Sequence, residues 1–275
     1  MAKFILLLLL AVAGCAQISP EEAAKFAPKD YFPNMKGCFL LHNVKSGITD
    51  RVIGDEYCKE QLVACSSFKV PLALIAFDSG VLKTTKQVFK WDRKKHEREA
   101  LNQDHNAQTW MRDSVVWFSQ IIAQKLGPKK MQKYLDAFEY GNKDLTGGLT
   151  TAWLHAPTSG KPSLNISAYE QLTFMNALWA GTLPVSKKAI ELTKEITFLE
   201  TSPKGYAVHG KTGSNSFNNN SRHRLGWFIS HIQKGEEEYI AITNLRDIAP
   251  ITEDGYGGFK AREITKEILT DMGHW

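Results

Sequence analysis

The order of strand-like and helix-like segments constrains the fold of this chain most. Five segments have the composition of strands: 37–44, 50–54, 206–210, 225–232 and 238–243. The last three lie close together in the sequence, which favours an antiparallel meander. Helical patterns fill most of the chain between the second and third strands. We therefore predict an α+β fold in which an antiparallel sheet is flanked by helices, with an all-helical lobe beside it and a cleft between the two lobes.

The middle helices are indicated by caps and by apolar spacing. Ser167 and Glu170 form a capping box before a helix that runs to Trp179, and Ser186 caps the next one. Residues 114–122 form an apolar helix that is closed by Gly127-Pro128, and a further helix carries Met131, Tyr134, Leu135 and Phe138 at helical spacing. Residues 85–112 lack clear periodicity, which predicts an extended excursion. A closing helix starts near Lys260 and buries Ile264, Ile268, Leu269 and Met272.

The first residues have the pattern of an export signal. Lys3 precedes the apolar run 4–12, which is too short to span a bilayer as a mature helix. We predict a signal peptide over residues 1–15 and one two-lobed domain over 16–275. The junction Val12-Ala13-Gly14-Cys15 resembles a lipobox, so Cys15 is a candidate for lipidation and a membrane tether. Ordinary cleavage after Ala16, which gives a soluble periplasmic protein, is the alternative.

The charge pattern argues against nucleic acid as a partner. The formal net charge is +5, with 43% hydrophobic and 23% charged residues, which is ordinary globular composition. The densest charged run, residues 92–99, mixes both signs and is typical of a solvated face. A mildly basic surface suits an anionic small substrate. No spacing of His209 or His231 with other residues suggests metal ligands.

The cysteines allow at most one bridge within the exported chain. Once Cys15 is set aside, Cys38, Cys58 and Cys65 remain, which is an odd number. Cys38 and Cys58 bracket the predicted hairpin and are the plausible pair. Cys65 is expected to be a buried apolar residue.

Ser66 and Lys69 form the main candidate for chemistry. On a helix, two residues at this spacing share one face about a turn apart. Pro71 fits only a first helical turn, so Ser66 is placed at a helix N-terminus, where developing negative charge is favoured. A serine needs a neighbouring base to act as a nucleophile, and the lysine can supply one. This tetrad alone is common by chance.

Four short patterns occur in order along the chain: Ser66-Ser67-Phe68-Lys69, Ser114-Val115-Val116, Tyr140-Gly141-Asn142 and Lys211-Thr212-Gly213. Together with Trp153-Leu154, they make the chain resemble the class D serine β-lactamases, the oxacillinases, from about residue 20 to residue 272. S-x-x-K and K-T-G also occur in class A enzymes and penicillin-binding proteins. The resemblance implies hydrolysis of β-lactam small molecules in the periplasm, without a metal or an organic cofactor.

The resemblance assigns the central chemistry to Ser66 and Lys69. Ser66 would attack the lactam carbonyl, and its backbone N–H and that of Ser214 would form the oxyanion hole. The uncharged form of Lys69 could add carbon dioxide from bicarbonate. Burial that excludes water would favour this form. The side chains expected to bury Lys69 are Phe68, Val116, Trp117, Trp153 and Leu154. The resulting carbamylated lysine would be the base in both half-reactions, and the Trp153 indole N–H would hold it.

The remaining roles concern proton relay and substrate binding. Ser114 would relay a proton between Lys211 and the leaving lactam nitrogen, while Lys211 and Thr212, with Gly213 beside them, would face the substrate carboxylate. The expected arginine of the last helix is replaced by Ala261, and Arg262 beside it is predicted to take over its role; Arg246 is a second candidate. The segment 140–142 is expected to shape the cleft wall.

Two other functions share the first acylation step. A peptidoglycan D,D-peptidase would deacylate slowly after reaction with a β-lactam, and an antibiotic sensor would stay acylated. A sensor normally needs transmembrane helices and an output domain, neither of which this sequence indicates. Sustained turnover of a chromogenic cephalosporin separates the first hypothesis from both alternatives.

Overall fold

The computed structural model describes residues 29–217, 222–252 and 255–275, and the compact unit that holds the sheet and its helices begins at Phe32. The predicted signal peptide, Cys15 and the cleavage site after Ala16 lie outside the described residues. None of the helices in the described part of the chain has the length and apolarity needed to span a bilayer.

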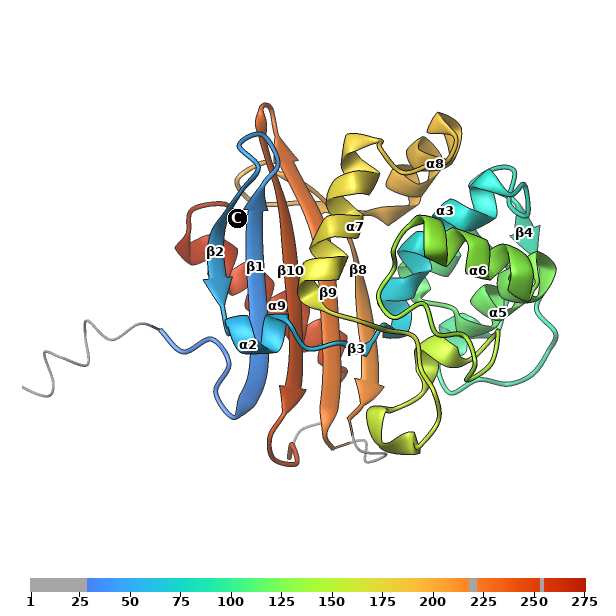
Figure 1. Ribbon diagram of the computed structural model, residues 1–275, viewed down its shortest axis with the longest axis horizontal. Helices are drawn as coiled ribbons and strands as arrows, with labels where there is room; N and C mark the ends of the chain where they lie inside the picture. The colour runs from blue at the N-terminus through green and yellow to red at the C-terminus, as the bar shows by residue number, and fades with distance from the viewer. Residues whose placement is uncertain (1–28, 218–221, 253–254) are drawn as a thin grey trace, which may run out of the picture. The chain divides into compact units, whose positions relative to one another are not determined.

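A six-stranded antiparallel sheet forms one lobe (Figure 1). Its strands are β1 (Met35–Asn43), β2 (Ile48–Ile53), β7 (Phe198–Thr201), β8 (Ala207–Ser216), β9 (Arg224–Lys234) and β10 (Glu237–Asp247). Their order is β2-β1-β10-β9-β8-β7, so the N-terminal hairpin joins the C-terminal meander through pairing of β1 with β10. The predicted single antiparallel sheet is confirmed. β7 was not predicted, because it is short and follows a helix directly, without turn residues between them.

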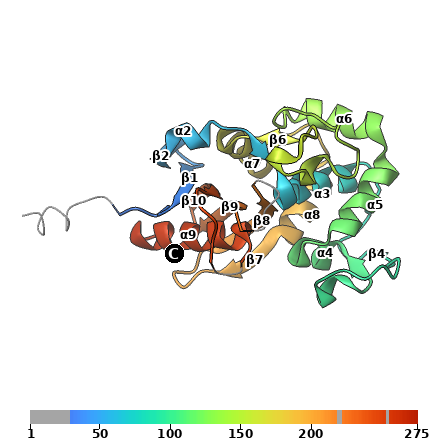
Figure 2. The same ribbon diagram turned by 90° about the horizontal axis from the view of Figure 1, so that it is seen from below.

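Two helices cover opposite faces of this sheet, α7 (Ala168–Ala180) and α9 (Gly257–Asp271) (Figure 2). The capping box predicted for α7 is present: the Ser167 side chain accepts a hydrogen bond from the Glu170 N–H, and the Glu170 carboxylate accepts one from the Ser167 N–H. On α9, Ile264, Ile268 and Leu269 are buried, as their spacing predicts. Met272, which was predicted to be buried with them, is only half-buried, because the helix ends at Asp271.

The second lobe is mostly helical. It is built from α3 (Lys69–Asp78), α4 (Ala107–Asp113), α5 (Val116–Leu126), α6 (Pro128–Ala137) and α8 (Lys187–Thr197). Short elements join the lobes or brace the loops: α2 (Asp55–Cys58), β3 (Leu62–Val63), η1 (Cys65–Phe68), β4 (Val88–Phe89), η2 (Glu99–Leu101), β5 (His105–Asn106), η3 (Ala152–Leu154), η4 (Pro157–Ser159) and β6 (Asn165–Ile166).

The segment 85–112 is not simply an extended excursion. β4 and β5 pair within it, and α4 occupies its last part because Asn106 and Thr109 form a capping box. The helix predicted from Ser114 begins only at Val116, since Ser114 has a left-handed backbone with a φ of 58° and ends α4. The structure therefore adds the short helix α4 before this turn, and the predicted helix begins two residues later, as α5.

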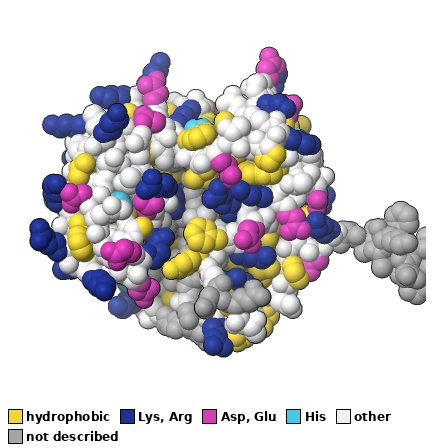
Figure 3. Space-filling model, turned by 180° about the vertical axis from the view of Figure 1, so that it is seen from behind, with side chains coloured by type: hydrophobic (Ala, Val, Ile, Leu, Met, Phe, Trp, Pro, Cys, Tyr) yellow, Lys and Arg dark blue, Asp and Glu magenta, His cyan; other side chains and the backbone are white. Residues whose placement is uncertain are grey.

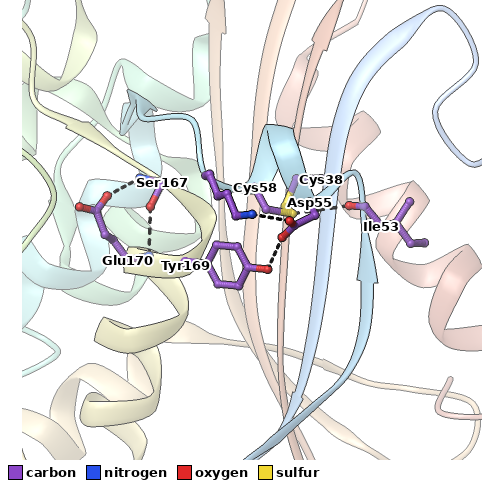
Figure 4. Close-up of a disulfide and its surroundings, with 8 residues drawn as sticks. Cys38, Ile53, Asp55, Cys58, Ser167, Tyr169 and Glu170 are labelled. Carbon is purple, nitrogen blue, oxygen red and sulfur yellow. Dashed lines mark hydrogen bonds and ion pairs between the residues drawn. A yellow bond between two sulfur atoms is a disulfide. The ribbon is translucent and has the colours of Figure 1, made fainter.

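A disulfide joins Cys38 on β1 to Cys58 at the end of α2, as predicted, with an S–S distance of 2.07 Å (Figure 4). The Tyr169 hydroxyl of α7 donates a hydrogen bond of 2.6 Å to the Asp55 carboxylate at the start of α2. This short helix is therefore tied both to the sheet and to α7. Cys65 is buried and has a free thiol, as expected.

Candidate active site

Ser66 lies where the sheet lobe meets α3. The neighbouring Cys65 has a left-handed backbone with a φ of 53°, which costs a residue other than glycine about 1–2 kcal/mol. The Ser67 hydroxyl donates a hydrogen bond of 2.6 Å to the Ala64 carbonyl and holds this bend. Between residues 62 and 70, Ser66 alone is not buried. The local structure therefore presents one hydroxyl at the surface of an otherwise closed segment, directly before the first turn of α3.

Lys69 is the first residue of α3, and its side chain is almost fully buried at 1% exposure. Its Nζ lies 3.1 Å from Ser66 Oγ, which confirms the predicted proximity. Burial, followed by the positive charges of Lys211 and Arg98, holds the pKa of Lys69 well below its usual range. Within the described residues, no carboxylate pairs with it. An uncharged amine at this distance can accept the hydroxyl proton.

Aromatic side chains close the space behind this pair. Phe68 packs against Trp153, with ring centroids 5.1 Å apart, and against Tyr140 at 5.7 Å. Trp153 is only 1% exposed, yet its indole N–H has no acceptor among the described residues. Tyr140 is fully buried behind Phe68. The segment 140–142 thus supports the site from behind and does not form the cleft wall that was predicted.

β8 lies directly against the serine segment. A Cβ on Gly213 would lie 3.0 Å from both Cys65 Cβ and the Ser67 backbone nitrogen, so only glycine permits this approach without displacement. Lys211 is 4% exposed, and its Nζ donates a hydrogen bond of 2.9 Å to the Thr212 carbonyl. Burial, with added repulsion from Arg98 and Arg262, lowers the pKa of Lys211 to about 7.

Ser114 faces Ser66 across a shared cavity. Its left-handed backbone turns the chain between α4 and α5, and its hydroxyl has no hydrogen-bond partner within the described part of the chain. Ser214 lies on β8, and its Oγ accepts a hydrogen bond of 2.9 Å from the Gly258 N–H of α9. The predicted oxyanion roles of the Ser66 and Ser214 amides remain predictions.

The cavity has a volume of about 450 Å³. On the face of the molecule that carries α9, basic and apolar side chains border a hollow near the middle (Figure 3). The cavity is lined by Ser66, Arg98, Leu101, Ser114, Val116, Thr212, Ser214, Asn215, Ser216, Arg224, Gly255, Tyr256, Gly257 and Phe259. Of the residues predicted to bind substrate, Val116, Thr212 and Ser214 therefore line it, whereas Gly213, Trp153 and Leu154 do not. The predicted catalytic residues Lys69 and Lys211 do not line it either.

The two arginines expected to meet a substrate carboxylate lie elsewhere. Arg262 forms an ion pair with Glu200, which also binds Lys266 at 2.8 Å. Arg246 pairs with Glu60. Neither arginine lines the cavity. This corrects the expected position of Arg262: residue 262 is one position along α9 from the buried Ala261, and its side chain finds a protein carboxylate as partner.

Sequence reasoning missed several cavity residues. Arg98 was assigned to a solvated charged run, and Leu101 belongs to a segment without periodicity. Tyr256 and Phe259 precede or begin α9, which was predicted to start later. Arg224 opens β9 and binds Asp247 through two hydrogen bonds of 2.9 and 3.1 Å. No motif marks these positions, because loops that are distant in the sequence bring them together.

The described residues contain no group of three or more His, Cys, Asp or Glu side chains that could hold a metal ion. The site instead combines a partly exposed serine, a buried amine with a lowered pKa, and a second buried lysine. This arrangement supports nucleophilic acyl transfer, in which a hydroxyl is activated by a neighbouring base.

Comparison with known proteins gives a consistent result. Residues 37–270 match the family described as the penicillin binding protein transpeptidase domain. The chain is 34% identical to beta-lactamase OXA-1 of Escherichia coli over 250 residues, which are 88% of each chain. It is 31% identical to the probable beta-lactamase YbxI of Bacillus subtilis (strain 168), covering 99% of this chain and 98% of that one. The solved class D beta-lactamase BAT-2 superposes with a TM-score of 0.78 at 31% identity, covering 89% of this chain and 94% of the other.

Proposed function

The chain belongs to the class D β-lactamases, enzymes that hydrolyse β-lactams, and we propose that it does so with Ser66 as nucleophile and a carbamate on Lys69 as general base. The observation that carries the proposal is the 3.1 Å separation between Ser66 Oγ and a buried lysine Nζ that no carboxylate of the described residues pairs with. Burial lowers the pKa of this amine and so favours its uncharged form, which is the form that reacts with carbon dioxide.

The site residues divide the reaction between them. Ser66 Oγ attacks the lactam carbonyl carbon and passes its proton to the base at residue 69. The C–N bond of the ring then breaks, and the ring nitrogen takes a proton through the Ser114 hydroxyl, which has no partner among the described residues and lines the same cavity. A water molecule then hydrolyses the ester on Ser66, which regenerates the hydroxyl.

The surroundings of Lys69 suit a carbamate. The Trp153 indole N–H lacks an acceptor among the described residues, although the ring packs on Phe68 beside Lys69. A carbamate would supply a negatively charged base, and this indole is the donor that would hold it. The nearby charges of Lys211 and Arg98 would favour the anion for the same reason that they disfavour an ammonium group.

Turnover and labelling test the two parts of the proposal separately. The wild-type chain should hydrolyse many equivalents of a chromogenic cephalosporin; consumption of a single equivalent would instead indicate a penicillin-binding peptidase or a sensor. With 13C-labelled bicarbonate, NMR should show a carbamate signal that disappears in Lys69→Ala. Absence of this signal from an active enzyme would overturn the carbamate but leave hydrolysis standing.

Lys69→Ala should also abolish steady-state turnover and, where it acylates at all, trap the acyl-enzyme. Mass spectrometry of the intact protein would detect the added mass. Wild-type rates should rise with added bicarbonate at low pH, because carbamylation is reversible. Rates that ignore bicarbonate would contradict this expectation.

We also propose that the chain is exported to the periplasm. The apolar run at residues 4–12 has the pattern of a signal peptide, and the Cys38–Cys58 disulfide fits an oxidising compartment. Metabolic labelling with a fatty acid, compared between the natural chain and Cys15→Ala, would distinguish a lipid tether from a soluble periplasmic form.

A further inference from the structure

The cavity is lined by two charged side chains, Arg98 and Arg224. They differ in how their charge is compensated. Arg224 is neutralised by Asp247, with side-chain exposures of 17% and 3%. Arg98 has no carboxylate within ion-pair distance among the described residues, since the neighbouring Asp113 binds Arg112 through two hydrogen bonds of 2.8 Å. Within the described chain, the cavity wall therefore carries one arginine that forms no ion pair, although the nearby Asp113 carboxylate interacts with it electrostatically.

The position of Arg98 is fixed by the chain beside it. Its Nη2 donates a hydrogen bond to the backbone carbonyl of Asp113, the residue before Ser114. The guanidinium group is thereby held at the wall that carries the Ser114 hydroxyl. A guanidinium has five N–H donors, and this contact uses one of them. The side chain is half-buried, so its remaining donors can face the cavity.

The charge of Arg98 also reaches the two catalytic lysines. After burial, the charge of Arg98 contributes most to the lowered pKa of Lys211. For the lowered pKa of Lys69, among the charged groups only Lys211 contributes more than Arg98 does. Arg98 lines the cavity, whereas the two lysines that feel its charge do not. The arginines of α9 and β10 are paired with carboxylates and do not line it either. An anionic group entering this cavity would meet a positive field.

We propose that Arg98 binds the carboxylate of the β-lactam nucleus from the helical-lobe wall of the cavity, opposite Thr212. This assignment rests on the proposed function, which supplies the substrate class. It transfers to residue 98 the role that Arg262 was expected to play, because Arg262 is paired with Glu200 outside the cavity. A planar guanidinium suits a carboxylate, with which it can form two parallel charge-assisted hydrogen bonds.

Binding to a Ser66→Ala chain tests the proposal without turnover. The ligands are a penicillin and its methyl ester, which differ in the charge of the nucleus carboxylate. Calorimetry should show that the parent Ser66→Ala chain binds the acid more tightly than the ester. Adding Arg98→Gln should weaken binding of the acid by about 10- to 100-fold, the range for a hydrogen bond to a charged group, and leave the ester unchanged within about twofold.

Two further variants keep the result specific. Arg98→Lys should recover most of the affinity for the acid, because it restores the charge. Lys95→Gln removes a charge from an exposed residue of the same segment that does not line the cavity, and it should change neither affinity. Equal losses for acid and ester in Arg98→Gln would overturn the proposal, because they would indicate that Arg98 only positions Ser114 through the Asp113 carbonyl.

A parent chain that does not prefer the acid, or an Arg98→Gln variant that retains its affinity for the acid, would also overturn it. Failure of the wild-type chain to turn over β-lactams, with the preference for the acid intact in Ser66→Ala, would remove the proposed hydrolysis and leave the carboxylate site standing.

Discussion

Replacing Lys211 by methionine measures the cost of burying a cation in this site. The structure lowers the pKa of Lys211 from 10.5 to about 7, mainly through burial. Between these two pH values the unfolded chain therefore binds a proton that the folded protein has released. Stability then rises with pH across this window, so the penalty is fully present below pH 7 and fades as the pH approaches 10.5.

The size of the effect follows from the same two values. Each pKa unit corresponds to about 1.4 kcal/mol. The destabilisation of the folded protein by Lys211 should therefore be about 4 kcal/mol smaller at pH 10 than at pH 6. Methionine has a similar length and no charge. Lys211→Met also loses the hydrogen bond to the Thr212 carbonyl. This loss reduces the stability gain of the variant over wild type by about 1–3 kcal/mol at every pH.

The assay is urea unfolding of wild type and Lys211→Met at several pH values from 6 to 10. We expect the stability difference to favour the variant most at pH 6 and to decline steadily toward pH 10, although the variant loses activity. Lys95→Met, at an exposed position, should show no such trend. A difference between wild type and Lys211→Met that stays constant across this range would refute the reasoning, because it would mean that burial does not disfavour the charged lysine.

Two further predictions concern the covalent and steric constraints. Replacing Cys38 and Cys58 by alanine should lower the free energy of unfolding by about 3 kcal/mol, because it opens a loop with a sequence separation of 20. Urea unfolding measures this loss, and reductant should produce it in the wild type. A wild-type protein that is equally stable with and without reductant would contradict the prediction. Gly213→Ala should reduce kcat/KM by about tenfold or more while the protein stays folded. The alanine Cβ must displace Cys65 or the Ser67 backbone, and this shift misplaces Ser66 between them. Unchanged kinetics would show that the contact relaxes freely.

The fold was largely predictable because its signals are local. Alternating apolar segments, the Ser167 capping box and the order of strands and helices predict one antiparallel sheet with flanking helices, and the structure confirms this. The errors fall where local signals are weak or compete. Ser114 has the sequence context of a helix start, but the chain turns there in a left-handed conformation, and β7 forms only because β8 offers it an edge.

The sequence by itself determined the reacting pair: a serine and a lysine three residues apart lie close together once Pro71 places the lysine in the first turn of a helix and the serine directly before it. Only the tertiary structure decided which cations remain free to meet a substrate. Arg262, Arg246 and Arg224 find carboxylates on neighbouring strands or loops, whereas Arg98 finds none among the described residues. Ion pairing depends on distances between residues far apart in the chain, and no local pattern records those distances.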